Sequence, residues 1–115
     1  MLKLKRAYEP AQRGDGFRVL VDRLWPRGVS KAKAKFDLWL KDVGPSTQLR
    51  KWFGHDPKRW KGFVSRYNKE LKSKVDDFKM LKAKSKRGTV TLIYGARDRE
   101  HNEALVIKKK VEKMK

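Results

Sequence analysis

The 115-residue chain contains no cysteine, and acidic residues, histidines and long apolar runs are scarce. The absence of cysteine excludes disulfides, thiolate metal sites and a cysteine nucleophile. The N-terminus, M-L-K-L-K-R, has no apolar run long enough for a signal peptide, and no stretch approaches the length of a membrane span. We therefore expect a cytoplasmic protein without a membrane partner.

Metal and nucleotide motifs are missing as well. The two histidines, His55 and His101, have no partner at a ligand spacing such as H-x-x-x-H, so we expect no metal site. The chain has no Walker loop and no G-x-G-x-x-G, and its G-D-G at 14–16 is too sparse to form a nucleotide loop. We expect no cofactor.

Positive charge is what the chain has in excess. Its 32 lysines and arginines stand against 13 aspartates and glutamates, which gives a formal net charge of +19. The excess is spread along the chain rather than held in a tail, and basic residues are frequent throughout 57–87. Charge of this kind attracts polyanions whatever the specific function of the protein.

Apolar patterns predict one α/β domain over residues 1–115, with a small, mainly parallel sheet and helices packed on its faces. Strands are expected at residues 2–5, 18–22, 36–41 and 90–94. The nearly continuous apolar runs at 19–21 and 90–94 are typical of central strands covered on both faces. Helices are expected at 47–53 and 57–71, over a shorter stretch from 75 that ends by 88, and over 104–114.

Local signals mark several helix ends. Ser46 or Thr47 can cap the helix that ends at Phe53, and Gly54 is well placed as its left-handed terminator. Asp56 followed by Pro57 is the pattern of an N-cap with proline in the first helical position.

Charged residues follow both central strands. One strand leads into Asp22-Arg23 and then Arg27, and the other leads into Arg97-Asp98 and on toward H-N at 101–102. Ligands of open α/β sheets collect beyond the carboxyl ends of central strands. If the two strands are parallel neighbours, Arg23, Arg27 and Arg97 converge on one crevice. Three planar guanidinium groups suit a carboxylate or a phosphate.

A purely structural interpretation of the same residues is open. Asp22 can pair with Arg97, and Asp98 can pair with Arg23 or Arg27, closing the end of the sheet. Asp98 can also cap the last helix, where acidic residues at 100 and 103 would complement the positive end of the helix dipole and disfavour an anion.

The histidines leave similar alternatives. His55 can act as a general acid or base with its ring oriented by Asp56, or it can simply occupy a tight turn between two helices. His101 is the better catalytic candidate because it follows Asp98. Ser46 lacks the G-x-S-x-G context of a nucleophile, which favours a capping role. The candidate proton-transfer residues are thus His101, Asp98 and Asp22, and the candidate ligand-binding residues are Arg23, Arg27, Arg97, Asn102 and His55.

Four motifs resemble the YeaO-like family of small bacterial and archaeal proteins. They are V-D-R-L-W-P-R-G at 21–28, W-L-K-D-V-G-P-S at 39–46, L-R-K-W-F-G-H-D-P at 49–57 and Y-G-A-R-D-x-x-H-N at 94–102. The resemblance covers essentially the whole chain and implies an α/β fold. It implies no established reaction, because the family is one of unknown function. Its larger relatives carry a cysteine just before the last helix, and any thiol chemistry of theirs does not transfer to this chain.

Two functions follow as hypotheses. The first is a protein whose arginine-lined crevice binds an anionic small molecule bearing phosphate or carboxylate, as a hydrolase or group-transfer enzyme or as a binding protein. The second is a non-specific nucleic-acid-binding protein that uses the lysine-rich helices. Against the second, Trp60, Phe63 and Tyr67 fall on the buried stripe of their helix and so offer no stacking surface. A scaffold role and the oligomeric state leave no mark in the sequence.

Overall fold

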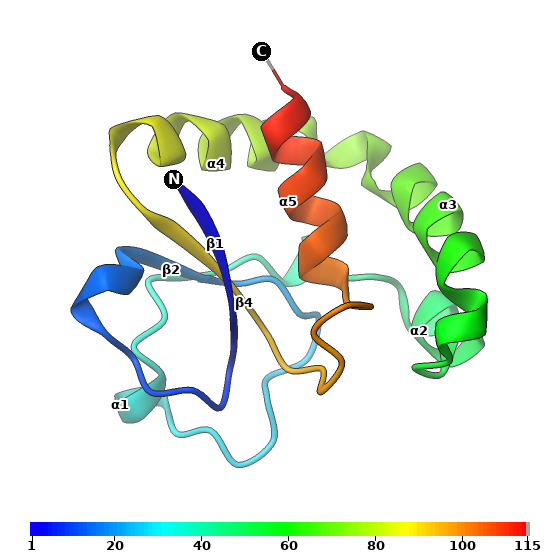
Figure 1. The fold of residues 1–115 in the computed structure, drawn as a ribbon, viewed down its shortest axis with the longest axis horizontal. Helices are drawn as coiled ribbons and strands as arrows, with labels where there is room; N and C mark the ends of the chain where they lie inside the picture. The colour runs from blue at the N-terminus through cyan, green and yellow to red at the C-terminus, as the bar shows by residue number, and fades with distance from the viewer. Residues whose placement is uncertain (115) are drawn as a thin grey trace.

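The computed structural model describes residues 1–114, and its centre is a sheet of four parallel strands (Figure 1). The strands run in the order β1-β4-β2-β3, with bounds β1 Leu2–Arg6, β2 Phe17–Leu20, β3 Leu38–Trp39 and β4 Val90–Tyr94. The expected parallel α/β architecture is confirmed.

The two strands predicted to be central are neighbours in the middle of the sheet. Val19 lies opposite Leu92 and Leu20 opposite Ile93, and all four side chains are fully buried. Strand β3 is shorter than the pattern at 36–41 suggested and pairs with β2 at the edge. Of the alternating apolar residues, only Leu38 lies in β3. Phe36 and Leu40 belong to the flanking loops and pack against the core from there.

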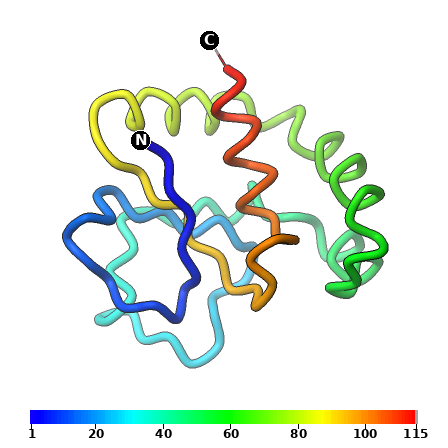
Figure 2. Tube along the Cα trace, viewed as in Figure 1, coloured from blue at the N-terminus to red at the C-terminus, as the bar shows by residue number. Residues whose placement is uncertain are grey.

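The longer helices are α2 Thr47–Phe53, α3 Trp60–Glu70, α4 Val75–Arg87 and α5 Glu103–Lys113. Their apolar side chains pack with Val19, Val21 and Leu92 in the main core. The helix from 75 is longer than α3, not shorter, because the helix continues through the lysine-rich turns as far as Arg87. The N-terminus lies beside the end of α4 (Figure 2).

The opposite side of the sheet has a different cover. Leu20 and Ile93 pack there with three aromatic side chains: Trp25 and Phe36 from the segment between β2 and β3, and Trp39 from β3. The same segment contains the short helix α1 Lys31–Ala34, which hydrophobic periodicity did not predict because it spans barely one turn. On this face the sheet is therefore covered mainly by the segment between β2 and β3 and not by a layer of long helices.

The predicted helix ends are present. Ser46 Oγ accepts a hydrogen bond from Leu49 N at 3.1 Å, and Gly54 adopts a left-handed conformation with φ 55°. Asp56 Oδ1 accepts from Lys58 N at 3.0 Å and starts a 3-10 turn over Pro57–Arg59 that runs directly into α3. These ends place α2 beside the carboxyl ends of β2 and β4. No helix within residues 1–114 is long and apolar enough to cross a membrane.

Candidate functional site

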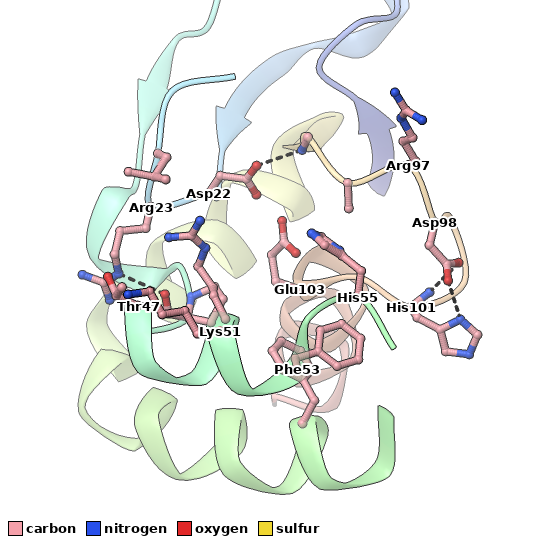
Figure 3. Close-up of a pocket in the computed structure, with 16 residues that line it drawn as sticks. Asp22, Arg23, Thr47, Lys51, Phe53, His55, Arg97, Asp98, His101 and Glu103 are labelled. Carbon is pink, nitrogen blue, oxygen red and sulfur yellow. Dashed lines mark hydrogen bonds and ion pairs between the residues drawn. The ribbon is translucent and has the colours of Figure 1, made fainter. Parts of the chain in front are cut away.

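A cavity of about 640 Å³ opens where β2 and β4 end (Figure 3). Its walls come from the exit of β2, from α2, from the loop after β4 and from the start of α5. Its volume falls within the range of small-molecule sites. The lining residues that carry charge or a ring nitrogen are Asp22, Arg23, Arg50, Lys51, His55, Arg97, Asp98, His101 and Glu103.

Asp22 joins the two strand exits. Its Oδ2 accepts a hydrogen bond from Gly95 N at 2.8 Å, and its backbone carbonyl accepts one from Trp39 Nε1 at 2.7 Å. A Cβ atom at position 95 would lie 3.0 Å from Asp22 Oδ2, so glycine permits this close approach. The carboxylate is therefore held in one orientation by backbone rather than by an arginine.

Glu103, in the first turn of α5, forms a carboxyl pair with Asp22. Burial raises the pKa of Glu103 well above its ordinary value, and the charge of Asp22 and a hydrogen bond with it raise this pKa further. Asp22 Oδ1 is buried and receives no hydrogen bond from an N–H or hydroxyl donor of the described residues. The raised pKa of Glu103 favours its protonated form, which can donate a hydrogen bond to this oxygen.

Arg23 lines the cavity, but its guanidinium is largely engaged by backbone. Its Nε donates to Pro45 O at 3.0 Å and its Nη2 donates to Gly44 O at 2.8 Å. A Cβ at Gly44 would lie 2.5 Å from Arg23 N, so the two segments are in direct contact. Arg23 thus fixes the loop before α2 to the exit of β2.

The expected convergence of three arginines does not occur. Arg27 is exposed and lies outside the cavity, because the turn after Trp25 carries the chain away from the sheet end. Arg97 lines the cavity, but in Figure 3 its side chain points away from Asp22. Positive charge near the carboxyl pair comes instead from α2, through Arg50 and Lys51.

The expected ion pairs are also absent among the described residues. Asp22 does not pair with Arg97, and Asp98 pairs with His101 rather than with an arginine, at 2.8 Å between Oδ2 and Nδ1. The hydrogen bond from Glu100 N, followed by that from His101, holds the pKa of Asp98 below its ordinary value.

The cap of α5 is Asn102, not Asp98. Asn102 Oδ1 accepts from Leu105 N at 3.1 Å, while its Nδ2 donates to Asp98 O at 3.0 Å. The residue is 1% exposed and does not line the cavity. Its hydrogen bond to Asp98 O holds the loop between β4 and α5, and the side chain does not face a ligand.

The two histidines lie on the cavity wall. The ring of His101 packs edge-on against Trp60, with centroids 5.3 Å apart. His55 has a positive φ of 57° in the turn after Gly54, and its ring points into the cavity in Figure 3. Asp56 does not orient this ring, because its carboxylate is used in capping the next turn. His55 therefore forms part of the turn that follows α2 and also lines the cavity.

Sequence reasoning missed the contribution of α2 and α5. The sequence pattern assigns Arg50 and Lys51 to a helix and Glu103 to the start of the last helix, where it complements the helix dipole, and it assigns none of the three to the cavity. The apolar wall was missed too; it comprises Leu24, Pro45, Phe53, Phe63 and Ala96. Within residues 1–114, no group of three or more histidine, aspartate or glutamate side chains is placed to hold a metal ion.

These features define a small parallel α/β protein with a mixed-charge cavity at the carboxyl ends of its central strands. More specifically, the chain belongs to the DUF488-N3i family, described as the inactive DUF488-N3 subclade, whose model matches residues 1–114. The resemblance to YeaO-like proteins is confirmed by the same comparisons.

Several uncharacterized proteins are similar to this chain. The YeaO protein of Escherichia coli K12 is 41% identical over 106 residues, which cover 92% of each chain. An uncharacterized protein of Mycobacterium tuberculosis H37Rv and one of Mycobacterium bovis are each 47% identical over 70 residues, or 61% of this chain and 59% of theirs. No solved structure matches.

Proposed function

We propose that the cavity binds a small organic molecule through an anionic group, a phosphate or a carboxylate, held by Arg50 and Lys51. The observation that carries this proposal is that both side chains line the cavity and form no ion pair or side-chain hydrogen bond within the described residues. Charged donors without a protein partner, beside an apolar wall, are what an anionic metabolite requires.

Binding without turnover is better supported than hydrolysis or group transfer. The pair Asp98–His101 has the geometry of an acid–base pair, but Thr47 is the only hydroxyl group among the cavity side chains, and no hydrogen bond joins it to a histidine. The family description, "inactive", agrees with a binding role. Nucleophilic catalysis needs a nucleophile in contact with its base.

A titration followed by NMR tests the proposal. Phosphate monoesters, nucleotides and dicarboxylates are added while the resonances of His55, His101 and the amide of Gly95 are monitored. We expect saturable shifts of these residues, and about tenfold weaker binding for Arg50→Gln or Lys51→Gln, because each removes a charged hydrogen bond.

Arg27→Gln is the matched control, since it removes one positive charge from an exposed arginine outside the cavity. It should leave the affinity unchanged within about twofold, because surface charge acts weakly across screened solvent. A silent cavity across the whole panel contradicts the proposal, and so does equal weakening by Arg27→Gln and Arg50→Gln.

Nucleic-acid binding is less well supported. Trp60 and Phe63 stack within the core, and the face of Trp52 is covered by the guanidinium of Arg66 at 3.9 Å from the ring centroid. The lysine-rich helices therefore present charge without a free aromatic platform for bases. Such a surface supports non-specific electrostatic attraction only.

A further inference from the structure

We propose that the ligand is zwitterionic: besides its anionic group it carries a protonated amine, which binds between the carboxyls of Asp22 and Glu103. This inference rests on the proposed function of the cavity and names the class of its ligand. Molecules with these two groups at a short separation include amino acids and aminoalkyl phosphates.

The carboxyl pair is built into the cavity. Asp22 is held by the backbone N–H of Gly95 at 2.8 Å, and Glu103 is held by its position in the first turn of α5. Both residues line the cavity, and Asp22 Oδ1 has no N–H or hydroxyl partner among the described residues. Apart from a proton on Glu103, nothing in the described residues donates to this buried oxygen, so it is free to accept a hydrogen bond from a ligand.

The charges around the pair disfavour a ligand that carries charge of only one sign. A purely anionic molecule held by Arg50 would lie in the same cavity as the charge of Asp22, which repels it. A purely cationic molecule would meet Arg50 and Lys51. A ligand that carries both signs makes favourable contacts with both groups, and this complementarity gives selectivity as well as affinity.

An ammonium group can take the place of a proton on Glu103. It offers three N–H donors, enough for both carboxylates and a neighbouring acceptor. When it enters, Glu103 releases its proton to the solvent, and the ammonium charge compensates the second carboxylate. No bond to carbon or phosphorus changes in this step. Binding is therefore accompanied by release of about one proton per ligand below the titration range of the pair.

Matched ligands and calorimetry test the inference. 2-Aminoethyl phosphate is compared with ethyl phosphate, and β-alanine with propionate, in two buffers of different ionisation enthalpy at the same pH. We expect the amine-bearing member of at least one pair to bind tenfold or more tightly than its partner. The difference in heat between buffers should correspond to about one released proton.

Two variants assign the effect to the pair. Glu103→Gln keeps a hydrogen-bond donor for Asp22 but removes the titrating group, so it should reduce the amine preference to less than threefold and abolish proton release. Glu100→Gln removes one negative charge from an exposed residue that does not line the cavity, and it should preserve both effects. Circular dichroism spectra confirm that each variant is folded.

The outcomes separate this inference from the proposed function. If ethyl phosphate and propionate each bind as tightly as their amine-bearing partners, the zwitterion is ruled out while anion binding stands. If no ligand of either pair binds, and the wider panel is also silent, both proposals fail. If Mg²⁺ or Ca²⁺ alone binds at the pair with release of the same proton, the pair is a cation site and the amine is the wrong ligand.

Discussion

Two carboxyls, those of Asp15 and Glu103, show how neighbouring groups shift a pKa in opposite directions. Asp15 contacts two cations, with Lys5 Nζ at 3.0 Å and Arg18 Nη1 at 2.6 Å. Burial by itself raises the pKa of Asp15, but hydrogen bonds from Gln12, Lys5 and Arg18 outweigh it and hold this pKa below its ordinary value. Burial raises the pKa of Glu103, and its neighbour, the carboxyl of Asp22, raises this pKa further. The ion pairs of Asp15 stabilise the fold, whereas Glu103 and Asp22 line the cavity.

Asp15→Asn is expected to destabilise the protein strongly. The change leaves the buried guanidinium of Arg18 without its counter-charge, and breaking a buried ion pair costs about 3–5 kcal/mol. Urea unfolding at neutral pH measures this loss, with the exposed Glu112→Gln as control. Because the folded-state pKa of Asp15 is lowered, its contribution is present above the unfolded value and is lost as pH falls through the folded value. A loss below about 1 kcal/mol would show that Arg18 is not dependent on Asp15.

The pH profile of Glu103 has the opposite sign. Its folded-state pKa lies above the ordinary value of 4.5, so the unfolded chain releases the proton first. Stability from this residue therefore falls as pH rises from about 4.5 to the raised folded value. Glu103→Gln should remove this slope and be the more stable protein at neutral pH. Urea midpoints measured from pH 4 to pH 8 check this, and parallel profiles for the two proteins would contradict it.

At the scale of elements, the sequence predicted what depends on neighbours along the chain. Such features include the apolar stripe from Trp60 to Tyr67 and the capping residues Ser46 and Gly54. Each depends on contacts with residues only a few positions away, and the structure confirms all of them. The roles of Arg23 and Asp22 depend on residues 22 and 73 positions away, Pro45 and Gly95. No periodicity encodes such contacts. The pattern therefore located the central strands, although β2 ends at Leu20 and not at Asp22, but it did not predict the partners of the residues that follow them.

The cap of α5 makes a measurable contribution at this scale. Asn102→Ala removes both the acceptor for Leu105 N and the donor to Asp98 O from a residue that is 1% exposed. We expect a loss of about 1–2 kcal/mol, since cap deletion alone costs about 1 kcal/mol. Asn102→Ser, which retains an acceptor, should recover part of this loss. Thermal unfolding at one pH compares the three proteins, and equal stability of Asn102→Ala and the parent would refute the cap.

On the scale of the whole molecule, the net charge of +19 acts independently of the cavity. Few of the acids that could balance it are paired: the ion pairs with lysine or arginine in the described residues involve Asp15, Asp56 and Glu9. The surface therefore carries a long-range positive field that attracts any anion and weakens as salt is added. Ligand binding in the cavity and attraction to the surface must be separated by experiment.

Paired variants make that separation. Lys79→Gln combined with Lys86→Gln removes two exposed charges from α4, while Arg50→Gln removes one from the cavity. The α4 double variant should reduce the slope of log affinity for duplex DNA against log salt concentration by about two, since each phosphate contact contributes about one. It should leave the affinity for the cavity ligand unchanged within about twofold, whereas Arg50→Gln lowers that affinity about tenfold.

Two duplexes of unrelated sequence should bind equally at the same salt concentration, because lysine contacts to phosphate carry no sequence information. A tenfold preference for one duplex would establish specific recognition and show that the charged surface does more than attract polyanions.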